Sequence, residues 1–179
     1  MSINQVFVTV GSTKFNELIT NITNPIFIQN LIKLKVKTLL IQYGNSDFSH
    51  VKTLIEDPQL TNGLQVNYYD FKPSITDDLT ASDLIICHGG SGTILEGLKL
   101  KKKLCVVNNS SLMDNHQLEL IKAFEADNYV VRFELEDLLI RFLEVNWNEL
   151  KLKEFESNNG QLFNNLLKDH LVVKRKLII

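Results

Sequence analysis

Apolar residues occur along this chain in short β-rich runs, separated by longer segments with helical periodicity or helix-capping residues. The runs predict six strands, at residues 6–10, 38–42, 64–69, 84–87, 104–107 and 129–131. The segments between them predict helices at residues 15–34, 47–56, 74–79, 93–100, 115–126 and 134–143. Alternating strands and helices form parallel sheets through right-handed crossovers, with helices on both faces. The expected fold class is therefore α/β, with an open, doubly wound, mostly parallel Rossmann-like sheet.

The pattern changes near residue 146 and divides the chain in two. Residues 1–145 are expected to form the Rossmann-like domain, and residues 146–179 a helical C-terminal extension that docks a partner. The last nine residues, 171–179, end in apolar side chains. They either pack on the chain's own core or dock on another protein, because apolar ends that cannot reach a core need a partner.

Composition excludes several classes of function. The 179 residues include 19 Lys+Arg and 21 Asp+Glu, a net charge of −2, so no general basic field is available for nucleic acid. The basic runs at 99–103 and 174–176 are short and are interpreted as a solvated turn and tail. The absence of a membrane-length apolar stretch or signal-peptide pattern predicts a cytosolic chain. Cys87 and Cys105 lie on predicted strands, which indicates reduced core residues and no metal site.

A glycine-rich turn, His88-Gly89-Gly90-Ser91-Gly92-Thr93, follows the fourth predicted strand and precedes a helix. Glycines let an anion approach the backbone closely, and the first-turn amides and dipole of a helix favour negative charge. We therefore expect a diphosphate site without a metal or other cofactor. The turn lacks the Gly-Lys-Ser/Thr of a P-loop and is not a Gly-x-Gly-x-x-Gly at the first strand, which disfavours nucleotide hydrolysis and NAD chemistry.

Three other groups of polar residues are predicted at the same edge of the sheet. Glu96 either forms a capping box with Thr93 or accepts the two hydroxyls of a ribose. Asn115, His116 and Gln117 open a helix and suit a polyhydroxylated sugar, whereas Asp114 before them is explained by N-capping alone. The turn 11–13 is either a simple turn or supplies a hydroxyl or amide contact to phosphate or to the acceptor. The candidate binding residues are Gly11, Ser12, Thr13, His88, Gly89, Gly90, Ser91, Gly92, Thr93, Glu96, Asn115, His116 and Gln117.

Four segments together resemble one family: 7–13, 41–44, 82–93 and 109–117, the last containing Leu-Met-Asp-Asn-His-Gln. The resemblance covers residues 6–131. The four segments resemble the cytosolic subunits of the UDP-N-acetylglucosamine transferases that add the second sugar of the dolichol-linked oligosaccharide. They are also similar to the donor-binding half of the bacterial peptidoglycan N-acetylglucosaminyltransferase, and of glycosyltransferase family 28 in general, in which two Rossmann-like halves form a GT-B enzyme.

The resemblance implies that residues 89–93 hold the diphosphate of UDP-N-acetylglucosamine, Glu96 the ribose, and His116 with Gln117 the sugar hydroxyls. It implies an inverting, metal-independent transfer with β-1,4 linkage to the 4-hydroxyl of N-acetylglucosaminyl-diphosphodolichol. It also implies a heterodimer with a membrane-anchored, acceptor-binding subunit, which holds this chain on the cytosolic face of the endoplasmic reticulum. The catalytic base is unassigned: His88 is one candidate, and the partner can supply another.

Two alternatives stay open. The chain could be a bacterial-type half glycosyltransferase acting on an undecaprenyl-linked acceptor, since composition does not select the lipid. It could also be a nucleotide-sugar-binding module without turnover. Restored activity in the presence of the anchored partner, abolished by Glu96→Ala, distinguishes an enzyme from such a module.

Overall fold

The computed structural model describes residues 2–109 and 115–155, and within them it contains one parallel sheet of six strands. The strand order is β3-β2-β1-β4-β5-β6, the order of a dinucleotide-binding Rossmann fold. The strands are β1 (Gln5–Thr9), β2 (Thr38–Gln42), β3 (Gln65–Tyr69), β4 (Leu84–His88), β5 (Lys103–Val107) and β6 (Val131–Phe133). Val8 of β1 pairs with Ile41 of β2 on one side and with Ile86 of β4 on the other.

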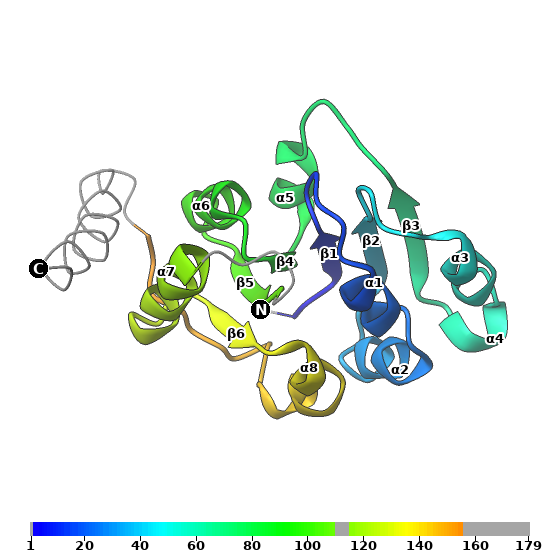
Figure 1. The fold of residues 1–179 in the computed structure, drawn as a ribbon. Helices are drawn as coiled ribbons and strands as arrows, with labels where there is room; N and C mark the ends of the chain where they lie inside the picture. Colours follow the sequence, from blue (N-terminus) through cyan, green and yellow to red (C-terminus); the bar gives the residue numbers. More distant parts are fainter. Residues whose placement is uncertain (1, 110–114, 156–179) are drawn as a thin grey trace, which may run out of the picture.

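Helices cover both faces of the sheet (Figure 1). Alternate strand residues point to opposite faces, so Val6 and Val8 enter one apolar cluster and Phe7 enters the other. The first cluster includes residues of α1 (Asn16–Ile22), α2 (Pro25–Lys33), α3 (Ser49–Ile55) and α8 (Leu135–Arg141). The second includes residues of α5 (Thr76–Ala81), α6 (Ser91–Lys99) and α7 (Asn115–Ala126). The doubly wound α/β prediction is confirmed.

The predicted helix at 15–34 is wrong, because two helices occupy this segment. Helix α1 ends at Ile22, and α2 begins at Pro25 after the N-cap Asn24. Proline lacks a backbone N–H and is favoured at the first position of a helix, and the Asn24 side chain accepts a hydrogen bond from the Ile26 amide (2.9 Å). The four-residue helix α4 (Pro58–Thr61) was not predicted, and β6 lies two residues later than expected.

Beyond η1 (Phe142–Glu144), residues 146–155 form a turn and irregular chain and contain no helix. Trp147 is fully buried, and its Nε1 donates to the Phe142 carbonyl (2.7 Å). Phe155 packs edge-on against Tyr129, with ring centroids 5.8 Å apart. The start of the predicted extension is therefore irregular chain packed on the sheet domain. Residues 156–179 lie outside the described residues, so the domain boundary and the docking role of the tail stay predictions.

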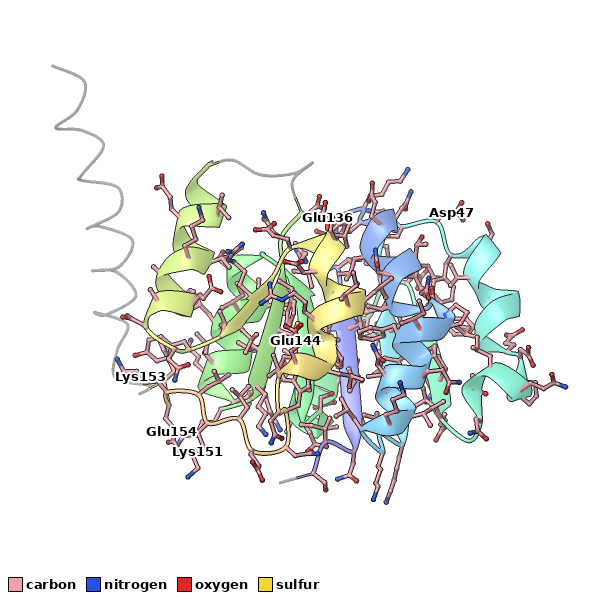
Figure 2. The ribbon with its side chains drawn as sticks, turned by 90° about the horizontal axis from the view of Figure 1, so that it is seen from below. Asp47, Glu136, Glu144, Lys151, Lys153 and Glu154 are labelled. Carbon is pink, nitrogen blue, oxygen red and sulfur yellow. The ribbon has the colours of Figure 1, made fainter. Side chains whose placement is uncertain are left out.

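The two ends of the sheet carry different polar side chains. Figure 2 shows Asp47 and Glu136 at one end of the molecule, with Lys151, Lys153 and Glu154 at the other. Asp47 follows β2 and Glu136 follows β6, so the first end is the carboxyl edge of the strands. None of the helices in residues 2–109 and 115–155 combines the length and the apolar character needed to cross a bilayer.

Candidate functional site

The carboxyl ends of β1 and β4 lie side by side at the point where the strand order changes direction. The chain runs outward from β1 through β2 to β3, and then returns to β4 on the other side of β1. Ligands of open α/β sheets bind in the crevice that forms at such a switch point. The structure thus brings together the turn after β1, residues 11–13, and the glycine-rich turn after β4, residues 88–93.

Gln42, at the end of β2, fixes the turn after β1. Its side chain is buried, and its Oε1 accepts from the Thr9 hydroxyl and from the Gly11 amide (3.0 Å). Its Nε2 donates to the carbonyls of Gly11 (2.8 Å) and Asp70 (3.0 Å). One buried amide therefore connects the ends of β1, β2 and β3. The sequence analysis did not identify this role; the available signal was a polar residue at the end of an apolar run.

The carbonyls of the turn after β1 face the loop after β2. Gly44 has φ +55°, and an added Cβ would lie 2.5 Å from the Gly11 carbonyl oxygen and 2.9 Å from that of Thr13. Asn45 donates its side-chain amide to the Ser12 carbonyl (2.9 Å) and its backbone amide to the Thr13 carbonyl (3.2 Å). These carbonyls are therefore bonded to the loop after β2. Ser12 itself is exposed, in the turn beside the switch point.

Helix α6 begins at Ser91, two residues earlier than predicted, with Gly90 as the N-cap. The first bond of this helix runs from the Ile94 amide to the Gly90 carbonyl (3.2 Å). The backbone amides of Ser91, Gly92 and Thr93 make no hydrogen bond within the described residues. Three unpaired N–H groups at a helix N-terminus favour an anion through both hydrogen bonding and the helix dipole.

The three glycines of this turn make room for different neighbours. A Cβ on Gly89 would lie 2.3 Å from Cδ1 of Ile121 in α7, and one on Gly90 would lie 2.7 Å from Nε2 of His88. A Cβ on Gly92 would meet no atom within 4 Å. Open space for a ligand therefore lies at Gly92, whereas Gly89 and Gly90 are required by packing within the protein.

His88 lies between the two glycine turns. Its Cε1 would be 3.1 Å from a Cβ on Gly11, and its Nδ1 is buried without a hydrogen-bond partner among the described residues. Burial lowers the pKa of the imidazole below its ordinary value of 6.5, and the main chain of Thr9 partly opposes this shift. His88 is therefore mainly neutral at pH 7, so it can meet a diphosphate as a neutral hydrogen-bonding group and not as a cation.

The capping-box interpretation of Glu96 is wrong. Because the N-cap is Gly90, Glu96 lies in the second turn of α6, beyond the position from which a carboxylate reaches the first amides. Its Oε1 accepts a hydrogen bond from the hydroxyl of Thr76, the first residue of α5. The Glu96 carboxylate is partly exposed, one turn beyond Gly92, and among the described residues its second oxygen has no donor.

The ends of β5 and β6 form a second polar region at this edge. The Asn108 side chain donates to Glu134 (3.2 Å), and its buried Oδ1 has no hydrogen-bond partner among the described residues. Arg132 bonds both Glu125 (2.8 Å) and Glu134. A pocket of about 250 Å³ lies here, lined by Phe15, Glu17, Asn108, Asn109, Glu134, Leu135 and Glu136. Its acidic residues were not among the sequence candidates.

Asn115, His116 and Gln117 form the first turn of α7, at the carboxyl edge beyond β5. The backbone placement agrees with the predicted helix at 115–126, while their side chains and Asp114 lie outside what the structure describes. Among the described residues, no group of three or more His, Cys, Asp and Glu side chains could hold a metal ion.

Comparison with known proteins gives the same family from sequence and from structure. The model of the glycosyltransferase family 28 C-terminal domain matches residues 5–171. The chain is 37% identical to the human UDP-N-acetylglucosamine transferase subunit ALG13 over 70% of its own length, but spans only 10% of that protein. It is 32% identical to the subunit of that name from Saccharomyces cerevisiae, over 90% of this chain and 93% of the relative.

Solved structures agree with this match. An NMR solution structure of ALG13 superimposes with a TM-score of 0.71 at 30% identity, covering 93% of this chain and 96% of that one. MurG of Acinetobacter baumannii superimposes with a TM-score of 0.65 at 19% identity, over 80% of this chain and 41% of MurG, which is a likeness of fold. The chain therefore belongs to the glycosyltransferase family 28 C-terminal domain family, and is similar to UDP-N-acetylglucosamine transferase subunits.

Proposed function

We propose that this chain is the donor-binding, catalytic subunit of a two-protein inverting glycosyltransferase. It transfers N-acetylglucosamine from UDP-N-acetylglucosamine to N-acetylglucosaminyl-diphosphodolichol, in the second step of lipid-linked oligosaccharide synthesis for N-glycosylation. The names of its relatives and its family membership support transfer of N-acetylglucosamine. The proposal goes beyond that support in the two-protein arrangement, the β-1,4 linkage and the acceptor, and these parts need experiment.

The observation that carries the proposal is the start of α6. The Ser91, Gly92 and Thr93 amides are unpaired among the described residues, and the position of a Cβ on Gly92 is open. As the bond between sugar and phosphate breaks, negative charge grows on the departing UDP. Fixed N–H dipoles beside that charge stabilise the transition state more than the ground state, because they need no reorganisation as the reaction proceeds. The chain's electrostatic task is to stabilise this leaving group.

Glu96 and the first turn of α7 supply the remaining donor contacts in this proposal. The free oxygen of Glu96, together with the one now bonded to Thr76, is suited to the two adjacent hydroxyls of a ribose. His116 and Gln117 begin a helix at the same edge and are assigned to the hydroxyls of N-acetylglucosamine. The turn at Gly11, Ser12 and Thr13 follows β1, the strand that pairs with β4, and β4 leads into α6.

The acceptor side of the reaction is assigned to a membrane-anchored partner. Relatives of this chain are named as subunits, which is consistent with a second protein. In this arrangement the chain is held at the cytosolic face of the endoplasmic reticulum by its partner. The partner also supplies the group that takes the proton from the attacking 4-hydroxyl, because the imidazole of His88 is largely enclosed between Gly11 and Gly90.

A titration with paired ligands tests the donor site. UDP-N-acetylglucosamine should bind more tightly than UDP-glucose or GDP-mannose, with and without the membrane subunit. UDP should bind more tightly than 2′-deoxy-UDP, and Glu96→Gln should weaken UDP by about ten- to hundredfold, since hydrogen bonds to a charged group contribute about 1.5–3 kcal/mol. In Glu96→Gln the difference between UDP and 2′-deoxy-UDP should largely disappear.

Glu144→Gln is the matched control, because Glu144 is an exposed carboxylate that pairs with Arg141 outside the site. It should leave UDP affinity unchanged. A Glu96→Gln protein that melts at a lower temperature but keeps its affinity for UDP would contradict the ribose assignment. In yeast depleted of its own ALG13 subunit, the chain should restore growth, and Glu96→Ala should not; a chain that binds donor but never restores transfer would indicate a module without turnover.

A further inference from the structure

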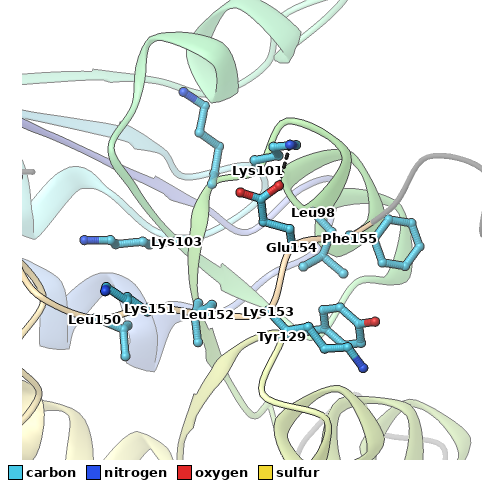
Figure 3. Close-up of a pocket in the computed structure, with 11 residues that line it drawn as sticks. Leu98, Lys101, Lys103, Tyr129, Leu150, Lys151, Leu152, Lys153, Glu154 and Phe155 are labelled. Atoms are coloured by element: carbon cyan, nitrogen blue, oxygen red, sulfur yellow. Dashed lines mark hydrogen bonds and ion pairs between the residues drawn. The ribbon is translucent and has the colours of Figure 1, made fainter.

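A pocket of about 320 Å³ lies at the amino edge of the sheet, at the end opposite to the candidate donor site (Figure 3). It is formed by the end of α6, the start of β5, Tyr129 and residues 150–155. Five lysines and one glutamate line it: Lys101, Lys102, Lys103, Lys151, Lys153 and Glu154. The whole chain has a net charge of −2, so this concentration of positive charge is a local feature.

The lysines come from segments that are distant in sequence. The run at 101–103 follows α6, whereas Lys151 and Lys153 lie on the irregular segment after η1. The backbone amide of Lys153 donates to the Asn128 carbonyl (2.8 Å), and the Asn128 side chain donates to the Lys151 carbonyl (3.4 Å). These bonds fix the second segment against the turn after α7, so the fold itself assembles the lysine pocket.

Within residues 2–109 and 115–155, most of these ammonium groups lack a carboxylate partner. Lys101 pairs with Glu154, but Lys102 donates to the Thr80 carbonyl (2.6 Å) and Lys103 to the Trp147 carbonyl. Carbonyl oxygens supply a dipole and no neutralising charge. Partial burial lowers the pKa of Lys103, opposed by the charge of Asp83, so its ammonium group is incompletely solvated.

The remaining two lysines border an apolar wall. The Lys153 ammonium group lies 4.9 Å from the centroid of the buried Tyr129 ring, and Lys151 makes no side-chain hydrogen bond or ion pair within the described residues. Leu98 and Phe155 complete the wall. A concave site with an excess of one charge sign and low-dielectric walls concentrates its field and attracts ions of the opposite charge.

We propose that this lysine pocket binds a phosphate-bearing anion, which the excess of positive charge from its five lysines attracts. A phosphate group accepts several hydrogen bonds at once and neutralises charge that the protein leaves uncompensated. The anion is either a soluble phosphate compound or the phosphate headgroup of a membrane lipid. The proposal does not depend on the function assigned to the opposite edge.

Inorganic pyrophosphate and amide NMR spectra of the complete chain provide the first test. Pyrophosphate should shift the amides of residues 101–103 and 151–153, separately from any shift at 90–93, which reports the proposed donor site. The double variant Lys151→Gln/Lys153→Gln should raise the Kd at the lysine pocket about tenfold, since each partly exposed charged contact contributes up to ~1 kcal/mol. Lys33→Gln/Lys122→Gln removes two lysines outside the pocket and should leave that Kd unchanged.

Vesicle sedimentation separates the two sources of phosphate. A lipid headgroup is identified if the protein sediments with phosphatidylcholine vesicles that contain phosphatidic acid and not with phosphatidylcholine alone. The variant Lys151→Gln/Lys153→Gln should then lose this sedimentation. Pyrophosphate binding without retention on vesicles identifies a soluble anion. The proposal is overturned if pyrophosphate shifts only the amides of residues 90–93 and the protein does not sediment with the vesicles. It is also overturned if the control variant weakens binding as much as the pocket variant does. The melting temperature of each variant without ligand shows whether it is folded.

Discussion

At the scale of single residues, Gly89 and Gly92 of the turn after β4 meet different requirements. Gly92→Ala should change the free energy of unfolding little, or raise it by up to about 1 kcal/mol, because alanine favours a helix and meets open space. The same methyl lies in the proposed path of the diphosphate, so UDP affinity should fall by about tenfold or more. Denaturant unfolding and UDP titration measure the two effects. Unchanged UDP affinity in this variant would place the diphosphate elsewhere.

Gly89→Ala is the contrasting substitution, since its methyl would overlap Cδ1 of Ile121. Overpacking of this kind costs about 1–3 kcal/mol of stability. Adding Ile121→Val removes the overlapping Cδ1, so the double variant should recover part of the loss. If the double variant is no more stable than Gly89→Ala, contact with α7 is not the reason for glycine at this position.

The buried imidazole of His88 should make the free energy of unfolding depend on pH. Burial lowers its pKa in the folded state, so on acidification from pH 7 the unfolded chain takes up the proton first, near pH 6.5. The free energy of unfolding should therefore fall as the pH drops below 6.5, until the folded-state pKa is passed. His88→Gln should show a shallower fall between pH 7 and pH 5 in urea unfolding. An identical slope in the two proteins would contradict the assignment of the buried, neutral imidazole.

Sequence reasoning at the residue scale found the polar groups that follow strands, and missed contacts between elements. Glycines and histidine after β4 are a local pattern, so their placement at the switch point was predictable. The bond from Thr76 to Glu96 joins residues 20 apart, and Gln42 reaches Gly11 and Asp70. No periodicity encodes such pairings, because they depend on which strand ends become neighbours.

At the scale of elements, buried parallel strands were the most predictable feature. β2 occupies the predicted residues 38–42, because the apolar run Leu39, Leu40 and Ile41 leaves little choice of limits. The helix 15–34 failed because its apolar periodicity runs through Pro25, and the local effect of proline outweighs periodicity. The start of α6 failed because Gly90 serves as N-cap without a capping side chain.

The N-cap of α2 supplies a prediction at this scale. Asn24→Ala removes the side-chain acceptor of the Ile26 amide and should lower the free energy of unfolding by about 1 kcal/mol. Asn24→Asp keeps an acceptor and should lose less. Both variants should bind UDP as the parent does, since α2 lies outside the turns that follow β1 and β4. Reduced UDP affinity in Asn24→Ala at full stability would link α2 to the site unexpectedly.

At the scale of the whole molecule, strand order determines which turns meet. Alternation of strands and helices predicted a parallel sheet, and parallel strands place every following loop at one edge. The order β3-β2-β1-β4-β5-β6 adds the switch point between β1 and β4. The lysine pocket at the other edge was not predicted, because its two lysine-bearing segments meet only through the path of residues 146–155, which the sequence analysis expected to be helical.

Residues 171–179 supply the prediction that concerns the molecule and its partner together. The family match ends at residue 171, so the apolar end of the chain lies beyond the part that the family model accounts for. If these residues dock on the proposed membrane-anchored subunit, a chain ending at residue 170 should keep its UDP affinity, because the proposed donor site includes no residue beyond 117. Its co-purification with the membrane subunit should fall strongly, and transfer activity with it.

Replacing only the apolar residues Leu177, Ile178 and Ile179 by serine should have the same effect, whereas Lys174→Gln/Lys176→Gln, which keeps the apolar end, should have less. Undiminished complex formation by the shortened chain would assign the interface to another surface of the domain.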